Sequence, residues 1–140
     1  MGVNYIKIMN KHHQNTMCFA CGKENSNGLG LKISVEKEQA FTTFTPNVTH
    51  EGLKGLVHGG VIATVLDETM VNILLSQGKD VVTAELKVRF RQPAKIGEPL
   101  NIVARKIKEH HKLIEIEAIA TTINGKIMAN GNGKFLLRRY

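Results

Sequence analysis

The chain of 140 residues contains no tryptophan, only two tyrosines and only five phenylalanines. Proteins that hold single-stranded nucleic acid stack its bases on aromatic side chains interleaved with basic ones, and this sequence has few aromatics and no basic run that could follow a phosphate backbone. The formal net charge of +7 nevertheless favours an anionic partner. We therefore expect a small anionic molecule rather than nucleic acid.

Long apolar runs and export signals are also missing. No apolar run reaches the eighteen or so residues that a membrane span requires without charges, and the segment from Met1 to His13 is too polar for a secretory signal. We expect a soluble, cytoplasmic protein with no membrane partner. Its length and its hydrophobic content of 42% suit one domain, with residues 1–17 as an N-terminal arm and residues 18–140 as the domain.

Cysteine is scarce, with Cys18 and Cys21 as the two copies. A zinc site needs four ligands, and His12 and His13 upstream are adjacent rather than separated as tetrahedral sites usually require. A redox pair would be followed by a helix, whereas the turn-forming segment 23–28 follows here. The pattern favours a third interpretation, two small buried thiols in an N-terminal loop, so we expect no metal and no cofactor.

The segment from Val57 to Gln77 is predicted to be a buried helix. Apolar residues recur at helical spacing at positions 61, 62, 65, 66, 70, 73 and 74, with further apolar residues at 63, 71 and 75. Such a helix must be wrapped by other elements. Gly59 and Gly60 lie at its start, where unpaired backbone amides at the positive end of the helix dipole can bind an oxyanion.

Two carboxylates, Asp67 and Glu68, lie in the middle of this apolar segment. An ionised group there costs several kcal/mol unless it is paired or solvated. On a helical wheel Asp67 is the more unusual of the two, because its neighbours include Ala63, Met70 and Val71. A functional carboxylate and an ion pair with a neighbouring strand are both compatible with this placement.

The remaining sequence predicts an antiparallel sheet. Period-two alternation and turn residues indicate strands over residues 28–35, 40–46, 81–91, 100–108, 113–122 and 126–137. In the segment 81–91, Thr83 is expected on the polar face with Lys87 and Arg89. Asn124-Gly125 predicts a hairpin, His110-His111 an exposed turn, and Gly131 and Gly133 a bulge or the close approach of another backbone.

Two strands, a long helix and four further strands predict an α+β fold in which a curved antiparallel sheet wraps around one central helix. A sheet with this many antiparallel strands has edges to cover, so we expect pairing with a second copy of the chain.

The segment His58-Gly-Gly-Val-Ile-Ala-Thr-Val-Leu-Asp67, together with Arg91-Gln-Pro-Ala-Lys-Ile-Gly97-Glu, resembles the signature of hotdog-fold acyl-CoA thioesterases of the phenylacetate-pathway type. This type belongs to the 4-hydroxybenzoyl-CoA thioesterase superfamily. Cys18-Phe-Ala-Cys-Gly22, with Gly28-Leu29, also resembles a segment common there. The resemblance implies a hotdog fold and a homodimer or homotetramer that hydrolyses an acyl-CoA to the free acid and coenzyme A.

The resemblance also implies roles for individual residues. Asp67 matches the carboxylate that acts as general base or nucleophile, and Gly59 matches the glycine whose N–H polarises the thioester carbonyl. Gly60 supports that turn, His58 lies beside the carbonyl, and Thr83 matches a residue that positions water. Substrate phosphates would be bound by basic residues, for which Lys87, Arg89, Arg91, Arg138 and Arg139 are the candidates.

One position departs from the family pattern. Relatives often carry Asn or Gln six residues before the histidine, where this chain has Gly52. Either the neighbouring Glu51 substitutes or the role is absent. Two other functions stay open: a hydratase or dehydratase, which the Gly-Gly after His58 disfavours, and an acyl-CoA-binding protein without catalysis.

Overall fold

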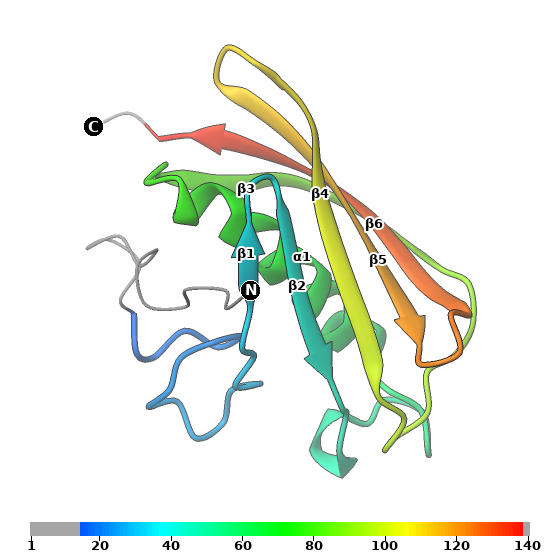
Figure 1. Ribbon diagram of the computed structural model, residues 1–140. Helices are drawn as coiled ribbons and strands as arrows, with labels where there is room; N and C mark the ends of the chain where they lie inside the picture. The colour runs from blue at the N-terminus through cyan, green and yellow to red at the C-terminus, as the bar shows by residue number, and fades with distance from the viewer. Residues whose placement is uncertain (1–14, 139–140) are drawn as a thin grey trace.

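The structure is a computed structural model and describes residues 15–138 (Figure 1). Most of the predicted N-terminal arm, including His12 and His13, lies outside the described residues, as does Arg139. The described part contains one long helix, α1 (Gly59–Ser76), and one six-stranded antiparallel sheet in the order β1-β2-β4-β5-β6-β3. The strands are β1 (Ser34–Glu36), β2 (Gln39–Phe44), β3 (Val81–Phe90), β4 (Leu100–His110), β5 (Leu113–Thr122) and β6 (Ile127–Leu137). The α+β architecture predicted from the sequence is confirmed.

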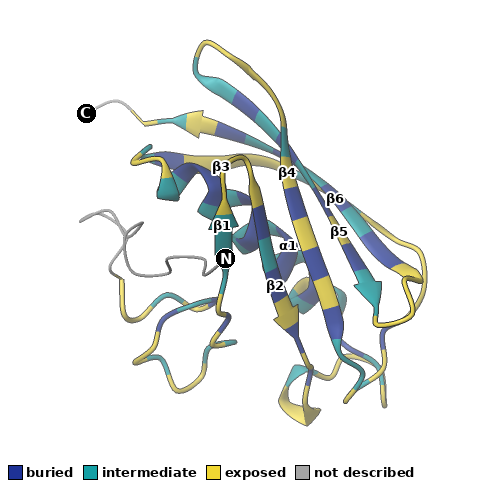
Figure 2. Ribbon diagram, viewed as in Figure 1, coloured by how far each residue is buried: buried dark blue, intermediate teal, exposed yellow. Residues whose placement is uncertain are grey.

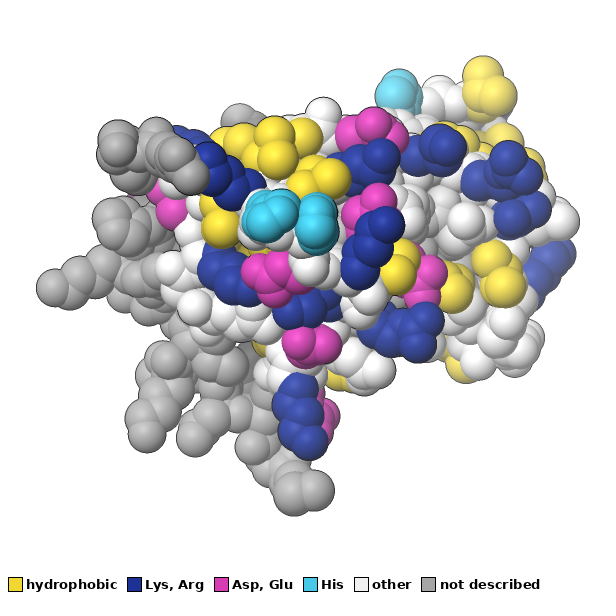
Figure 3. All heavy atoms as spheres, turned by 90° about the horizontal axis from the view of Figure 1, so that it is seen from above, with side chains coloured by type: hydrophobic (Ala, Val, Ile, Leu, Met, Phe, Trp, Pro, Cys, Tyr) yellow, Lys and Arg dark blue, Asp and Glu magenta, His cyan; other side chains and the backbone are white. Residues whose placement is uncertain are grey.

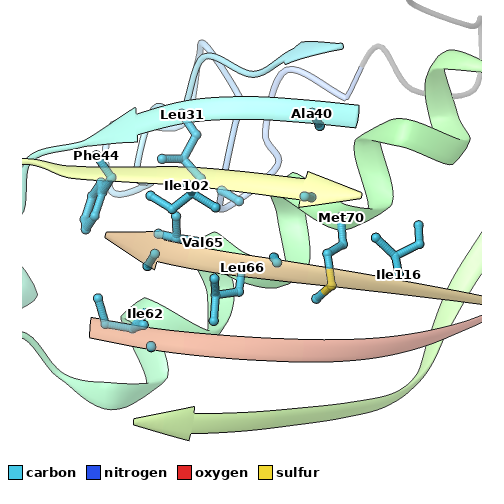
Figure 4. Packing of buried hydrophobic residues seen from close by; sticks show 14 of the residues in the cluster. Leu31, Ala40, Phe44, Ile62, Val65, Leu66, Met70, Ile102 and Ile116 are labelled. Carbon is cyan, nitrogen blue, oxygen red and sulfur yellow. The ribbon is translucent and has the colours of Figure 1, made fainter. Parts of the chain in front are cut away.

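Helix α1 packs on one face of the sheet, and the core lies between them (Figures 1 and 4). Its buried residues are Ile62, Val65, Leu66, Thr69, Met70, Ile73 and Leu74. Buried and exposed positions alternate along β2 and β4, as expected for a sheet that is covered on one face (Figure 2). Val61, Val71 and Leu75 of α1 are only half-buried within residues 15–138.

Helix α1 is long and apolar enough to cross a membrane by length and composition alone. Packing in the core also explains why α1 is apolar, because seven of its residues are buried there. At its C-terminal end the backbone N–H groups of Gly78 and Lys79 donate to the carbonyls of Leu75 and Leu74. Gly78 has a φ of 77°, so glycine at this position ends the helix without strain.

The first strand is shorter than predicted. Residues 28–33 are not in the sheet, and β1 begins at Ser34. The reason is that the N–H groups of Leu29 and Leu31 donate to the carbonyls of Phe19 and Ala20 in the N-terminal loop. The alternation of residues 28–35 therefore reflects burial of Leu31 against the core rather than strand pairing.

Strand β3 contains a bulge that the sequence did not predict. Thr83 pairs with Phe135 of β6, but the next pair joins Glu85 to Lys134, so Ala84 is the extra residue. Phe135 is fully buried beneath α1, and Thr83 therefore faces the helix. Beyond the bulge the helix-facing residues are Leu86, Val88 and Phe90, while Glu85, Lys87 and Arg89 face outward. The predicted placement of Thr83 on the polar face with Lys87 and Arg89 is wrong, because a bulge reverses the alternation.

Glycines in β6 allow α1 to approach the sheet closely. A Cβ at Gly131 would lie 3.3 Å from Leu66 Cδ1, and one at Gly133 would lie 2.6 Å from the ring of Phe135 and 3.2 Å from Met70 Cε. The sequence predicted a bulge or the close approach of another backbone at these glycines, and the structure instead places side chains of α1 and β6 against them.

The two late hairpins are as expected. Gly125 has a φ of 84° between β5 and β6, and its N–H donates to the carbonyl of Thr122. His110 and His111 are exposed between β4 and β5 and contact each other edge to face. Figure 3 shows this end of the molecule, where acidic and basic side chains are interspersed, among them the ion pairs of Lys79 and Lys106 with Glu109.

Candidate active site

The residue pair Asp67 and Thr83 forms the centre of the candidate site. Asp67 projects from the middle of α1, and the bulge in β3 turns Thr83 toward it. The Thr83 hydroxyl donates a hydrogen bond of 2.9 Å to Asp67 Oδ1. The structure thus brings together two predicted site residues that lie on different elements, sixteen positions apart in the sequence.

The environment of Asp67 favours its protonated form. Burial raises the pKa of the Asp67 carboxyl, the hydrogen bond from Thr83 lowers it, and the charge of the neighbouring Glu68 raises it again. The net effect is a pKa above the ordinary value for aspartate. A carboxylate of raised pKa is a stronger base, and such groups occur preferentially at functional sites.

The N-terminus of α1 presents one free backbone donor. His58 is the N-cap residue, and its Nδ1 accepts a 2.8 Å hydrogen bond from the Gly60 N–H. Val61 and Ile62 donate to the His58 carbonyl. Within residues 15–138 the Gly59 N–H donates to no acceptor. Of the two glycines predicted to bind an oxyanion, Gly59 is therefore available and Gly60 is occupied by His58.

The structure gives His58 a role at the helix start that the sequence did not predict. Because Nδ1 accepts a hydrogen bond, it carries no proton in this arrangement, and the ring can present only Nε2 to a substrate. The side chain caps the helix. Gly52 packs against His58, since a Cβ at Gly52 would lie 2.9 Å from His58 Cα. A larger residue at position 52 would displace the cap, which gives the absent Asn or Gln a steric explanation.

Glu51, which neighbours the missing polar residue, is engaged within its own loop. Its carboxylate accepts a hydrogen bond from the Gly55 N–H within its own loop, and its backbone pairs with Val57. Glu51 therefore stabilises the loop that leads into α1.

A small apolar pocket of about 210 Å³ lies beside Gly59. Its lining includes Val57, Ile62 and Phe90, and the Phe90 ring lies 3.3 Å from the point where a Cβ at Gly59 would stand. Arg91 and Gln92 contribute its polar edge. The sequence analysis did not predict that Phe90 lines a pocket. The apolar alternation along β3, on which Phe90 lies, could have indicated it.

The predicted basic residues lie apart from the Asp67 carboxylate in this chain. Lys87 and Arg89 are exposed and face outward on β3. Arg91 is also exposed, and its Nε donates to Asn130 Oδ1. Arg138 pairs with Asp80 at the opposite end of β3. Of these four residues, Arg91 alone borders the pocket beside Gly59.

Gly59 and Asp67 are eight residues apart on one helix, which separates them by about 12 Å along the axis. That distance is too great for the N–H of one and the carboxylate of the other to act on the same carbonyl group. The two groups that the family resemblance implicates therefore lie at different places within one chain.

Known proteins resemble this chain in sequence and fold. A protein family model described as the thioesterase superfamily matches residues 54–129, which include α1 and the segments around it. A Saccharolobus solfataricus protein named as an esterase is 30% identical over 120 residues, covering 84% of this chain and 79% of its own. Acyl-coenzyme A thioesterase 13 of Mus musculus is 28% identical over 102 residues, covering 71% and 73% of the two chains.

Among solved structures, zebra fish thioesterase superfamily member 2 aligns over 99% of both chains with a TM-score of 0.79 at 21% sequence identity. At that identity the likeness concerns the fold, which is the hotdog fold expected above. The family model covers more than half of the 140 residues, and its match contains Asp67, Thr83 and the N-terminus of α1. The chain belongs to the thioesterase superfamily.

Proposed function

We propose that this protein hydrolyses an acyl-CoA thioester to the free acid and coenzyme A. The observation that carries the proposal is the half-buried Asp67 carboxylate, which is held by Thr83 and has a pKa raised by burial. The relationship to an acyl-coenzyme A thioesterase supports the choice of coenzyme A as the thiol. Assignment to the phenylacetate-pathway type remains a finer prediction.

The proposed chemistry uses Asp67 and the Gly59 N–H. Asp67 removes a proton from water as the water oxygen attacks the carbonyl carbon, with Thr83 orienting the carboxylate and the water. Negative charge develops on the carbonyl oxygen and is stabilised by the Gly59 N–H at the positive end of α1. The carbon–sulfur bond then breaks, and the departing thiolate takes the proton from Asp67. Direct attack by Asp67, which would form an anhydride, is the alternative route to the same products.

A second copy of the chain completes the site in this proposal. The separation of about 12 Å between Gly59 and Asp67 along α1 requires that the Gly59 N–H of one subunit meet the Asp67 carboxylate of its partner. Strand β3 is at the edge of the sheet, and its outer edge has no partner strand within residues 15–138. Pairing two β3 edges would satisfy those backbone groups and bring the two halves together. A homodimer is thus the smallest active form.

A larger assembly would use the uncovered face of the sheet. Val103 and Ile119 are direct cross-strand neighbours there and are 43% and 38% exposed. Two dimers packed through this face would form the tetramer that the sequence left open.

The proposed substrate explains the positive net charge. The pocket of about 210 Å³ beside Gly59 would hold the apolar acyl group, while Arg91 at its edge and the exposed Lys87 and Arg89 of either subunit would bind coenzyme A phosphates. Gly60 positions the donor at Gly59 through its bond to His58. A cytoplasmic location, with no nucleic acid or membrane partner, is part of the same proposal.

The test measures thiol release from short, medium, long and aryl acyl-CoAs by the wild-type chain, D67N and E36Q. Removal of a general base should lower kcat by about two to four orders of magnitude, whereas E36Q, which changes an exposed carboxylate on β1, should match the wild type. Circular dichroism and light scattering verify that D67N keeps its fold and assembly. Binding of acyl-CoA without turnover by the wild type would contradict hydrolysis and favour a non-catalytic binding protein.

A further inference from the structure

The N-terminal loop and α1 bring together three side chains that commonly bind metal ions. The sulfur atoms of Cys18 and Cys21 and a carboxylate oxygen of Glu68 lie within 4.8 Å of one another. All three residues are half-buried. The thioester chemistry proposed above uses none of them, and Glu68 lies fifty positions beyond Cys18, so the sequence did not associate them.

We propose that Cys18, Cys21 and Glu68 bind one zinc-type divalent cation that fastens the N-terminal loop to α1. Two thiolates and one carboxylate are ligands that zinc accepts in tetrahedral sites, and a CxxC spacing is the usual way to supply two of them. The fourth position is occupied by water or by a further donor.

The loop holds the two thiols in place before any metal arrives. The Gly22 N–H donates to the Cys18 carbonyl at 2.8 Å, and the Glu24 N–H donates to the Thr16 carbonyl at 2.9 Å. A Cβ at Gly22 would lie only 2.4 Å from Cys18 N, so this tight turn requires glycine after the second cysteine. The buried Ala20 anchors the loop in the core.

Tetrahedral zinc with bonds of about 2.3 Å to sulfur and about 2.0 Å to oxygen places its ligand atoms about 3.5 to 3.8 Å apart. The Cys18 Sγ–Glu68 Oε1 distance is already 3.8 Å and every separation is within 4.8 Å, so the contraction required is at most about 1.3 Å. Changes in side-chain torsion angles can supply that contraction without moving the backbone of α1.

In the part of the chain that the structure describes, Glu68 has no cationic partner that would compete with the metal. Within residues 15–138 no lysine or arginine forms an ion pair with it. Its Oε1 accepts hydrogen bonds from the Asn72 amide at 3.2 Å and from the Cys18 thiol at 3.8 Å. The amide also donates to the Glu68 carbonyl, so Asn72 orients the carboxylate toward the thiols. A metal ion would replace the two thiol protons and bind between the thiolates and the carboxylate.

Metal binding must release the thiol protons. Burial, together with hydrogen bonding to Glu68, raises the pKa of the Cys21 thiol. Zinc binding converts two thiols and one Zn²⁺ into a dithiolate complex and two protons. The affinity should therefore rise with pH, as it does for other thiolate sites.

The cluster also lies next to the proposed base. The charge of Glu68 contributes to the raised pKa of Asp67. A bound cation would fix the part of α1 from which Asp67 projects.

The test is a cobalt titration of the reduced, metal-free wild-type chain, with both thiols verified by a thiol reagent. Saturation at one Co²⁺ per chain, thiolate-to-cobalt charge-transfer absorption, tetrahedral visible bands and displacement by Zn²⁺ are expected. A reduced wild-type chain that binds neither ion, or binds with octahedral spectra only, would overturn the proposal. This readout needs no variant and is independent of hydrolytic activity.

Variants then identify the ligands. C18S and C21S should lose the charge-transfer bands, and E68Q should weaken binding by at least about tenfold. D67N is the matched control, because it changes the adjacent carboxylate outside the cluster and should bind cobalt as the wild type does. Zinc should raise the melting temperature of the wild type and D67N but not of C21S. Unchanged binding by C21S and E68Q would assign the metal elsewhere and overturn the proposal.

Discussion

Opposing local effects set the pKa of the Asp67 carboxyl, the group on which the proposed hydrolysis depends. Asp67 is half-buried in an apolar helix, and burial raises its pKa, while a single hydrogen bond from Thr83 lowers it. An ionised group in such a place is tolerated only because that bond stabilises its charge. The two residues therefore act as one unit, and a substitution of Thr83 should change the pKa of Asp67.

We predict that T83V shifts the acidic limb of the pH profile of kcat/KM to higher pH. The substitution keeps the shape of the side chain but removes the hydroxyl that donates to Asp67, so the pKa of Asp67 should rise further. At the pH optimum, loss of this hydrogen bond should lower kcat by about tenfold or less. T83S, which retains the hydroxyl, should keep the wild-type profile. A T83V profile that is lower but not displaced would show that Thr83 does not act through Asp67.

We also predict that D67N is more stable than the wild type at neutral pH. The folded-state pKa of Asp67 is raised, so the protonated carboxyl contributes stability that is present below the unfolded-state pKa of 3.8 and is lost as pH rises through the folded-state pKa. The asparagine side chain that D67N introduces does not titrate, and removal of a strained functional group commonly adds about 0.5 to 2 kcal/mol.

Thermal unfolding of D67N and the wild type across a pH series measures whether the stability difference has this sign. The melting temperature of D67N should exceed that of the wild type near neutrality, and the difference should shrink toward pH 4 and below. A difference that grows on acidification would mean that Asp67 is stabilising in its ionised form.

At the scale of an element, the N-terminus of α1 combines a structural and a functional requirement. His58 caps the helix by accepting from the Gly60 N–H, which leaves the Gly59 N–H as the exposed donor. Glycine at position 59 also admits the Phe90 ring from β3. The local sequence His-Gly-Gly thus builds a helix start that is capped at one amide and open at the next.

Substitution of His58 can separate these requirements. H58A removes the cap and should lower the free energy of unfolding by about 0.5 to 2 kcal/mol, whereas H58N retains a capping side chain and should cost little. Chemical denaturation measures both. If His58 serves only as a cap, H58N should also keep wild-type kcat/KM. Loss of activity by a stable H58N would assign the ring Nε2 a direct role toward the substrate.

For the whole molecule, the excess of seven positive charges is distributed over a small surface. Acidic side chains are interspersed with basic ones at the end shown in Figure 3, while Lys87 and Arg89 are exposed on the outer face of β3. A net positive field of this kind attracts the phosphates of coenzyme A. Added salt screens the field and so shortens the range of this attraction.

We predict that kcat/KM for an acyl-CoA falls by about three- to tenfold when ionic strength rises from low to high, because screening weakens long-range attraction. A thioester of N-acetylcysteamine, which lacks phosphates, is the matched control and should be much less sensitive. Initial rates at low substrate concentration measure both. Equal salt dependence of the two thioesters would exclude electrostatic attraction of the nucleotide.

The sequence by itself determined the succession of elements, the limits of α1 to within two residues and the identity of Asp67 and Gly59 as unusual residues. These features depend on local periodicity, turn residues and the helix dipole, which a short stretch of chain contains in full. A local pattern cannot reveal distant partners, and this explains why residues 28–33 were wrongly predicted to be a strand. Their hydrogen-bond partners lie in another loop.

The tertiary structure alone decided which side chains meet. The bulge at Ala84 reverses the alternation of β3 and turns Thr83 toward Asp67, and no local pattern marks an extra residue whose position is fixed by pairing with β6. The same holds for Glu68, which joins Cys18 and Cys21 only when the N-terminal loop packs on α1. Contacts between distant segments follow from the register and packing of the folded chain, and these are properties of the whole molecule rather than of any one stretch.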